Sequence, residues 1–117
     1  MEHSMYVSHY HDTPEQTVTD PGAEEATIRW LISSPEGAPN FAMRLIELGS
    51  EGQSPYHTHG FEHEIYVLSG VGEVVGADGR WPLHQGSVVF VRPGEEHNFR
   101  NRGDEPFRFI CCIPLTS

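Results

Sequence analysis

The sequence predicts an all-β protein, an antiparallel sandwich or barrel, from three features. Short runs rich in branched and aromatic residues have the length of strands rather than helices. Clusters of Gly, Pro, Asp and Ser separate these runs at short intervals, as turns do. No stretch has the apolar period of an amphipathic helix of three turns. The expected strands are Thr27–Ser33, Phe41–Leu48, Glu64–Leu68, Gly72–Val75, Ser87–Val91, Asn98–Arg102 and Phe107–Ile113.

Residues 1–26 differ in character from the rest of the chain. They are polar and acidic, are interrupted by Pro14 and Pro21-Gly22, and carry no sustained apolar period. We expect a loosely ordered N-terminal arm here, with one edge strand at most. Because 117 residues make about one ordinary domain, we expect a single β-barrel domain over residues 27–117.

Composition excludes several classes of function. The 7 basic and 17 acidic residues give a formal net charge of -10, which would repel nucleic acid or an anionic membrane surface. All basic residues are arginines, so Schiff-base chemistry and a lysine general base are excluded. The start Met1-Glu2-His3-Ser4 lacks the pattern of a secretion signal, and no apolar run approaches the roughly 18 residues of a membrane span. We expect a cytoplasmic protein with reduced Cys111 and Cys112 and a small-molecule ligand.

Two short motifs gather four histidines. Within His57-Thr58-His59, the two imidazoles would share one face of a strand, because strand side chains alternate. His63 opens the next expected strand, and His97 follows a Pro-Gly turn, so an antiparallel arrangement would return both to one cavity. Each histidine alone is more often an ordinary surface or core residue. Four at these spacings indicate a metal site.

The same motifs resemble those of the cupins. The stretch from Gly52 to Gly70 is similar to the first cupin motif, with its His-x-His pair and a lead-in spacer one residue short. The stretch from Gly86 to Asn101 is similar to the second motif, with Arg92 where the first proline is usual. The resemblance spans roughly residues 27–114 and implies a single-domain cupin-type β-barrel, or jelly roll. It also implies a homodimer, in which the N-terminal arm crosses to the partner.

The resemblance further implies that one divalent transition metal per chain is held by His57, His59, His63 and His97. Most cupins carry a glutamate at the position of His63, whereas the phrase Glu-His-Glu around it is shared with small four-histidine cupins. A register shifted by one residue would make Glu64 the ligand and turn His63 away. Imidazole suits manganese, iron, nickel, copper and zinc, among which we favour manganese or iron.

A site of this kind has several uses. Four neutral imidazoles leave the ion its full charge, which favours an anionic ligand, and octahedral coordination leaves two open positions. Tetrahedral zinc would instead close the site and serve structure. The leading hypothesis is an oxidoreductase of dioxygenase-like type acting on a small organic molecule. The alternatives are a metal-dependent isomerase, lyase or cyclase, and a module that binds a small ligand without turnover.

Four further residues are candidates for the substrate pocket. If Arg108 faces solvent, alternation turns Phe109 and Cys111 inward, with plain core packing as the alternative to a pocket role. Phe99 shares the face of His97 by the same parity. Arg44 interrupts an apolar strand, so it must reach solvent, the simpler interpretation, or hold an anion such as a substrate carboxylate. A narrow apolar cavity would favour a flat aromatic or alkenyl ligand, and a wide polar one a sugar.

Overall fold

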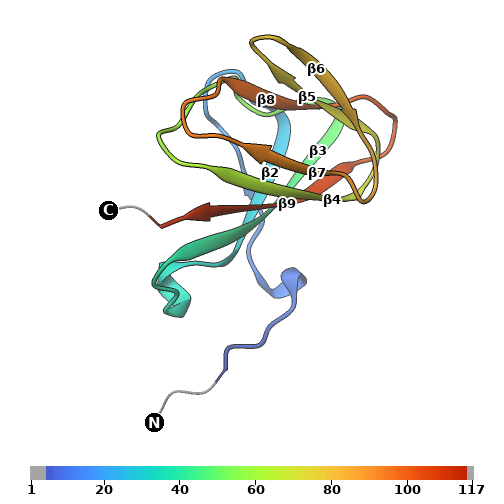
Figure 1. Ribbon diagram of the computed structural model, residues 1–117. Coiled ribbons are helices and arrows are strands. Elements are labelled where there is room, and N and C mark those ends of the chain that lie inside the picture. The colour runs from blue at the N-terminus through green and yellow to red at the C-terminus, as the bar shows by residue number, and fades with distance from the viewer. Residues whose placement is uncertain (1–4, 116–117) are drawn as a thin grey trace.

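The computed structural model describes residues 5–115, which form an antiparallel sheet curled into a jelly-roll half-barrel (Figure 1). None of its helices is long and apolar enough to cross a membrane. The strands are β1 (Gln16–Thr17), β2 (Glu24–Ile32), β3 (Phe41–Gln53), β4 (His63–Ser69), β5 (Gly72–Gly76), β6 (Gly79–Leu83), β7 (Val88–Val91), β8 (His97–Asn101) and β9 (Phe107–Pro114), with single 3-10 turns η1 (Tyr10–Asp12) and η2 (Ser34–Glu36). The predicted all-β class is confirmed.

The curled sheet forms two walls that share β3. In one wall the strand order is β2, β3, β9, β4 and β7. In the other wall the order is β3, β8, β5 and β6. Along Phe41–Leu48, β3 pairs with β9, whereas its last residue, Gln53, pairs with Arg100 of β8. One long strand therefore fixes both walls, and the β2–β3 hairpin runs beyond the barrel to the η2 turn at its tip (Figure 1).

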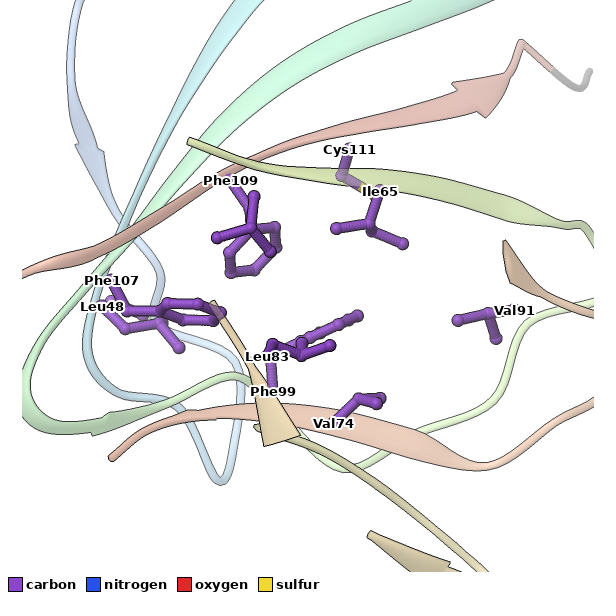
Figure 2. Packing of buried hydrophobic residues seen from close by; sticks show 11 residues of the cluster. Leu48, Ile65, Val74, Leu83, Val91, Phe99, Phe107, Phe109 and Cys111 are labelled. Atoms are coloured by element: carbon purple, nitrogen blue, oxygen red, sulfur yellow. The ribbon is translucent and has the colours of Figure 1, made fainter. Parts of the chain in front are cut away.

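Side chains from the inner faces of both walls fill the space between them. Phe107, Phe109, Leu48 and Val67 are at most 1% exposed. The ring of Phe109 lies 4.8 Å from that of Phe99 and 5.3 Å from that of Phe107, measured between centroids. Figure 2 shows these three aromatic side chains, which come from β8 and β9, pointing into one interior. Burial of such large apolar side chains is the main stabilising contribution to a domain of this size.

The strands differ most from the predicted ones at β6, at β3 and at the start of β2, which begins at Glu24 instead of Thr27. β6 was not expected, because only Leu83 of its five residues is buried and the strand has no alternating pattern. β3 continues through the turn expected at Gly49–Gly52, with Glu51 at a φ of 62° beside an irregular register between β2 and β3. Within the N-terminal arm, β1 is an edge strand that places Gln16 opposite Ile28. Strands with polar side chains or a local bulge thus lack the apolar pattern by which a strand is predicted from sequence, although backbone hydrogen bonds form them.

Gly70 allows the tight passage from β4 to β5. Its φ is +92°, and a Cβ atom placed on it would lie 2.5 Å from the carbonyl oxygen of Pro106 and 2.8 Å from Cα of Phe107. These neighbours are backbone atoms, so they cannot move aside as a side chain can. Gly86 has nearly the same φ, +91°, but nothing lies within 4 Å of its Cβ position. Substitution of Gly86 would therefore destabilise the fold by backbone strain alone, whereas substitution of Gly70 would add steric overlap.

We expect the substitution Gly86→Ala to cost about 1 to 3 kcal/mol of stability through backbone strain alone. Gly70→Ala carries the same strain plus an overlap with fixed backbone, and we expect its melting temperature to lie at least about 10 °C below that of Gly86→Ala. Thermal unfolding followed by circular dichroism measures both. Equal melting temperatures would contradict the close approach of Gly70 to β9.

Candidate metal centre

Four histidine rings meet at the junction of β8, β4 and the loop that precedes β4. His57 and His97 form an antiparallel bridge, with N–H···O distances of 3.1 Å and 3.0 Å between their backbones. His63 is the first residue of β4. The ring centroids are 4.2 Å apart for His57 and His59, 5.0 Å for His59 and His63, 5.2 Å for His63 and His97, and 5.3 Å for His57 and His97. The structure thus brings together the four histidines singled out in the sequence.

His57 and His59 do not lie on a regular strand, so the local conformation expected for them is wrong. His57 takes part in a single bridge, and His59 lies in a loop. The loop is held at two points instead, by the bridge to His97 and by Gly94, whose N–H donates to the carbonyl of His59 at 2.7 Å. The Pro-Gly turn of the second motif therefore clamps the first motif.

The alternation of β4 decides which residue of Glu62-His63-Glu64 faces the cluster. His63 is 4% exposed and Glu64 is exposed, as the inward and outward positions of a strand require. Glu64 lies opposite Cys112 of β9, on the outer face. The register therefore turns His63 towards the other histidines and Glu64 away from them. The shifted register considered from the sequence, in which Glu64 faces inward, does not occur in the structure.

In two of the rings, the contacts of Nδ1 leave Nε2 as the nitrogen available to a ligand. Nδ1 of His97 lies 3.0 Å from the carbonyl oxygen of Glu95, and because a carbonyl only accepts, Nδ1 carries the proton and Nε2 keeps its lone pair. Nδ1 of His63 lies 3.4 Å from Sγ of Cys111, while its Nε2 is buried without a hydrogen-bond partner. A buried polar atom without a partner is rare, and an ion would satisfy it. These residues fit a metal ion.

The rings do not stand in a finished coordination sphere. Across residues 5–115, no three His, Cys, Asp or Glu side chains already have a metal-binding arrangement. The ring of His59 stacks on that of Phe61, with centroids 4.7 Å apart and planes 8° apart.

Burial lowers the pKa of three histidines of the cluster, His57, His59 and His63. Desolvation, followed by the neighbouring rings of His59 and His97, lowers the pKa of His57 to about 4. Desolvation, followed by the charge of Arg44, lowers the pKa of His63 to about 3, and burial also lowers the pKa of His59. Neutral imidazole is the form that binds a metal, so these three rings need lose no proton at neutral pH.

A cavity of about 350 Å³ adjoins the four histidines. Strand register explains its floor: Trp30 of β2, Arg44 of β3 and Cys111 of β9 lie side by side in one row, and Ile28, Ile46 and Phe109 form the next. Residues of the N-terminal arm form part of its lining. The lining residues are Gln16, Thr17, Val18, Thr19, Asp20, Ala26, Ile28, Trp30, Arg44, Ile46, Ser54, Pro55, His57, His59, His63, His97, Phe99, Phe109 and Cys111.

All four candidate pocket residues from the sequence line this cavity. Phe99 lies 5.8 Å from His97 between ring centroids, and Phe109 packs against Phe99. Burial raises the pKa of the Cys111 thiol, which is therefore neutral. The solvent-facing interpretation of Arg44 is wrong, because the pleat of β3 turns this side chain inward, and its Nη2 donates to Sγ of Cys111 at 2.8 Å.

Sequence reasoning missed two parts of the cavity. Ile28 and Trp30 were placed on a strand without a role, although their parity with Ala26 would have put them on one face. The segment from Gln16 to Asp20 gave no signal, because four of its five residues are polar and exposed, and only the partly buried Val18 packs against the core. It joins the cavity through the pairing of β1 with β2.

Comparison with known proteins agrees with this architecture. The family model described as "Cupin domain" matches residues 44–113. The structure of the polyketide cyclase RemF from Streptomyces resistomycificus is similar, with 35% identity, a TM-score of 0.91, and coverage of 97% of this chain and 81% of that chain. A sugar phosphate isomerase of the cupin superfamily from Silicibacter pomeroyi shares the fold, with 20% identity, a TM-score of 0.80, and coverage of 91% of this chain and 73% of that chain.

Curated relatives are found among archaeal enzymes. Glucose-6-phosphate isomerase from Pyrococcus abyssi is 36% identical over 91 residues, which cover 68% of this chain and 48% of that protein. Its counterpart from Pyrococcus horikoshii is 35% identical with the same coverage. This chain spans about half the length of the curated relatives it matches.

The lowered pKa values make the stability of the metal-free protein depend on pH. An unfolded histidine binds a proton below about pH 6.5, whereas His57 and His63 in the folded chain resist protonation down to about 4 and about 3. The unfolded state therefore binds more protons in this window, and stability falls as pH falls from 6.5 towards 4. We expect the melting temperature of the chelated protein to drop less over this range in His63→Asn than in the wild type. The matched control is His84→Asn, at an exposed position outside the cluster, and an equal drop in all three proteins would contradict the burial of His63.

Proposed function

Because this chain belongs to the cupin family, we propose that it is a metal-dependent cyclase or isomerase that acts on a small carbonyl compound. RemF, a polyketide cyclase, is similar over nearly the whole chain, and the curated relatives are isomerases. Isomerisation and ring closure by carbonyl addition both proceed without net oxidation. The dioxygenase-like activity favoured from sequence finds no support among these relatives, whereas the isomerase or cyclase alternative does.

The aromatic side chains in the cavity lining are the observation that favours a cyclase. Three aromatic rings, those of Trp30, Phe99 and Phe109, line it together with Ile28 and Ile46. Flat aromatic walls bind planar, conjugated molecules through stacking and burial of apolar area. We therefore propose a planar substrate with several carbonyl groups, as in a polyketide. A sugar phosphate isomerase is the second candidate, because the curated relatives carry that activity.

We propose that one divalent ion per chain is held by His57, His59, His63 and His97, with manganese or iron favoured over nickel, copper or zinc. Bound there, the ion would polarise a substrate carbonyl and make the adjacent C–H group more acidic. The residues of the chain would do the rest. The aromatic walls orient the substrate plane, and the residues of the arm define one side of the opening. Asp20 is the only acidic residue among the described lining residues and is a candidate proton acceptor.

We also propose that the chain forms a homodimer. Large apolar side chains lie exposed on β4 and β7, where Val88 is 74%, Tyr66 50% and Phe90 48% exposed. Exposed apolar residues grouped in this way are typical of interfaces between subunits. Sedimentation equilibrium tests the proposal, and a mass equal to one chain of 13.1 kDa would contradict it.

Metal content is the first test of the site. We expect about one equivalent of metal per chain in the untagged protein, by elemental analysis, and almost none in the double variant His57→Ala with His59→Ala. The control variant His9→Ala with His11→Ala removes the histidine pair of the arm and should keep the metal. Full metal in the first variant, or none in any protein after reconstitution, would exclude the four-histidine centre.

The reaction class is tested by the need for dioxygen. We expect the metal-loaded protein to cyclise a short aromatic poly-β-ketone at the same rate with and without air, followed by ultraviolet absorbance, and we expect no oxygen uptake. The variant lacking His57 and His59 should be at least about 100-fold slower. Uptake of one dioxygen per product would restore the oxidoreductase hypothesis, and interconversion of glucose 6-phosphate and fructose 6-phosphate would favour the sugar phosphate isomerase instead.

A further inference from the structure

Arg44 is the only lysine or arginine among the described residues that line the cavity. It lies in the middle of β3, where hydrogen-bond register sets Trp30 on one side of it and Cys111 on the other. The next inward residue along the strand is Ile46. The sheet therefore holds a cation in an apolar row directed at the cavity, beside the histidine cluster.

The contacts of Arg44 leave its charge unbalanced. Its Nη2 donates to the sulfur of Cys111 at 2.8 Å, its guanidinium carbon lies 5.4 Å from the ring centroid of Trp30, and its Nε is buried without a partner. Neither a neutral thiol nor an indole ring carries a negative charge. Within residues 5–115, the ion pairs found between arginine and carboxylate side chains involve other arginines, namely Arg29, Arg80, Arg102 and Arg108.

Such an arrangement is costly unless an anion completes it. A desolvated cation without a counter-ion destabilises a fold, and a carboxylate that reaches it restores the lost interaction. The guanidinium plane is held by the contacts with Trp30 and Cys111, so an arriving carboxylate would meet an oriented donor rather than a mobile side chain. Of the described lining residues, only Asp20 is acidic, and no ion pair between it and Arg44 is found among the described residues.

We propose that Arg44 is the carboxylate-binding residue of the cavity and that the ligand is a planar organic carboxylate. Its anionic end binds the guanidinium, while its conjugated body lies along Phe99 and Phe109 towards the histidines. The inference rests on the proposed function in one respect, because it takes this cavity to be the substrate site. Beyond that function, the inference specifies that the substrate is an anion and that its carboxylate end is bound by Arg44.

The test compares two ligands of the same shape that differ in charge, cinnamate and cinnamamide, by isothermal titration calorimetry. We expect the wild-type protein to bind cinnamate at least about tenfold more tightly than cinnamamide, since a hydrogen-bonded charge pair contributes more than a neutral one. Arg44→Met should bring the ratio of the two affinities to about one without weakening cinnamamide, and Arg44→Lys should give an intermediate ratio. Arg80→Met removes an equal charge far from the cavity and should leave the ratio unchanged.

Two further readouts separate the role of Arg44 from folding and from the metal. Because Arg44→Met removes a partly buried charge that has no counter-ion among the described residues, we expect its melting temperature to equal or exceed that of the wild type. The titrations are made on the protein as purified and after chelation, so a preference for cinnamate that survives chelation belongs to Arg44 even if the metal-dependent reaction is absent. The proposal fails if the preference persists in Arg44→Met, if that variant melts well below the wild type, or if neither ligand binds the wild-type protein at millimolar concentration.

Discussion

The backbone bridge between His57 and His97 is the interaction on which the histidine cluster depends. Its hydrogen bonds of 3.1 Å and 3.0 Å join a loop to the first residue of β8, although the two residues are far apart in the sequence. The bond from Gly94 to His59 adds a second attachment of the same two segments. Backbone hydrogen bonds therefore hold the two segments together, and the proximity of the four rings follows from this pairing.

The cavity follows from the same sheet but from different strands. Paired residues of β2, β3 and β9 form its floor. In β8, the ring of His97 contacts that of Phe99, and this contact joins the histidine cluster to the hydrophobic core. The rings of Phe107 and Phe109 fill the interior next to this cavity (Figure 2). Phe109 also lines the cavity, so the hydrophobic core and the cavity share a wall.

Much of this could be predicted from the sequence, and the exceptions have physical reasons. Strand-length runs and spaced motifs were enough to predict the fold class and to single out four histidines, because periodicity and turn chemistry are local properties. The position of Arg44 could not be predicted in the same way, since a lone arginine among apolar residues usually reaches solvent and only the register with Trp30 and Cys111 shows that it does not. β6 and the arm residues near Gln16 have no apolar pattern, so their place depends on partners that local sequence does not reveal.

The cavity floor and the histidine cluster are encoded in separate parts of the chain. Ile28, Trp30 and Ile46 belong to the β2–β3 hairpin, whereas all four histidines lie between residues 57 and 97. A change of shape in the hairpin therefore need not disturb the histidines, and a change of ligand atoms need not reshape the floor. In evolutionary terms the scaffold is modular: the hairpin that shapes much of the cavity floor can vary in sequence while the histidine cluster is retained.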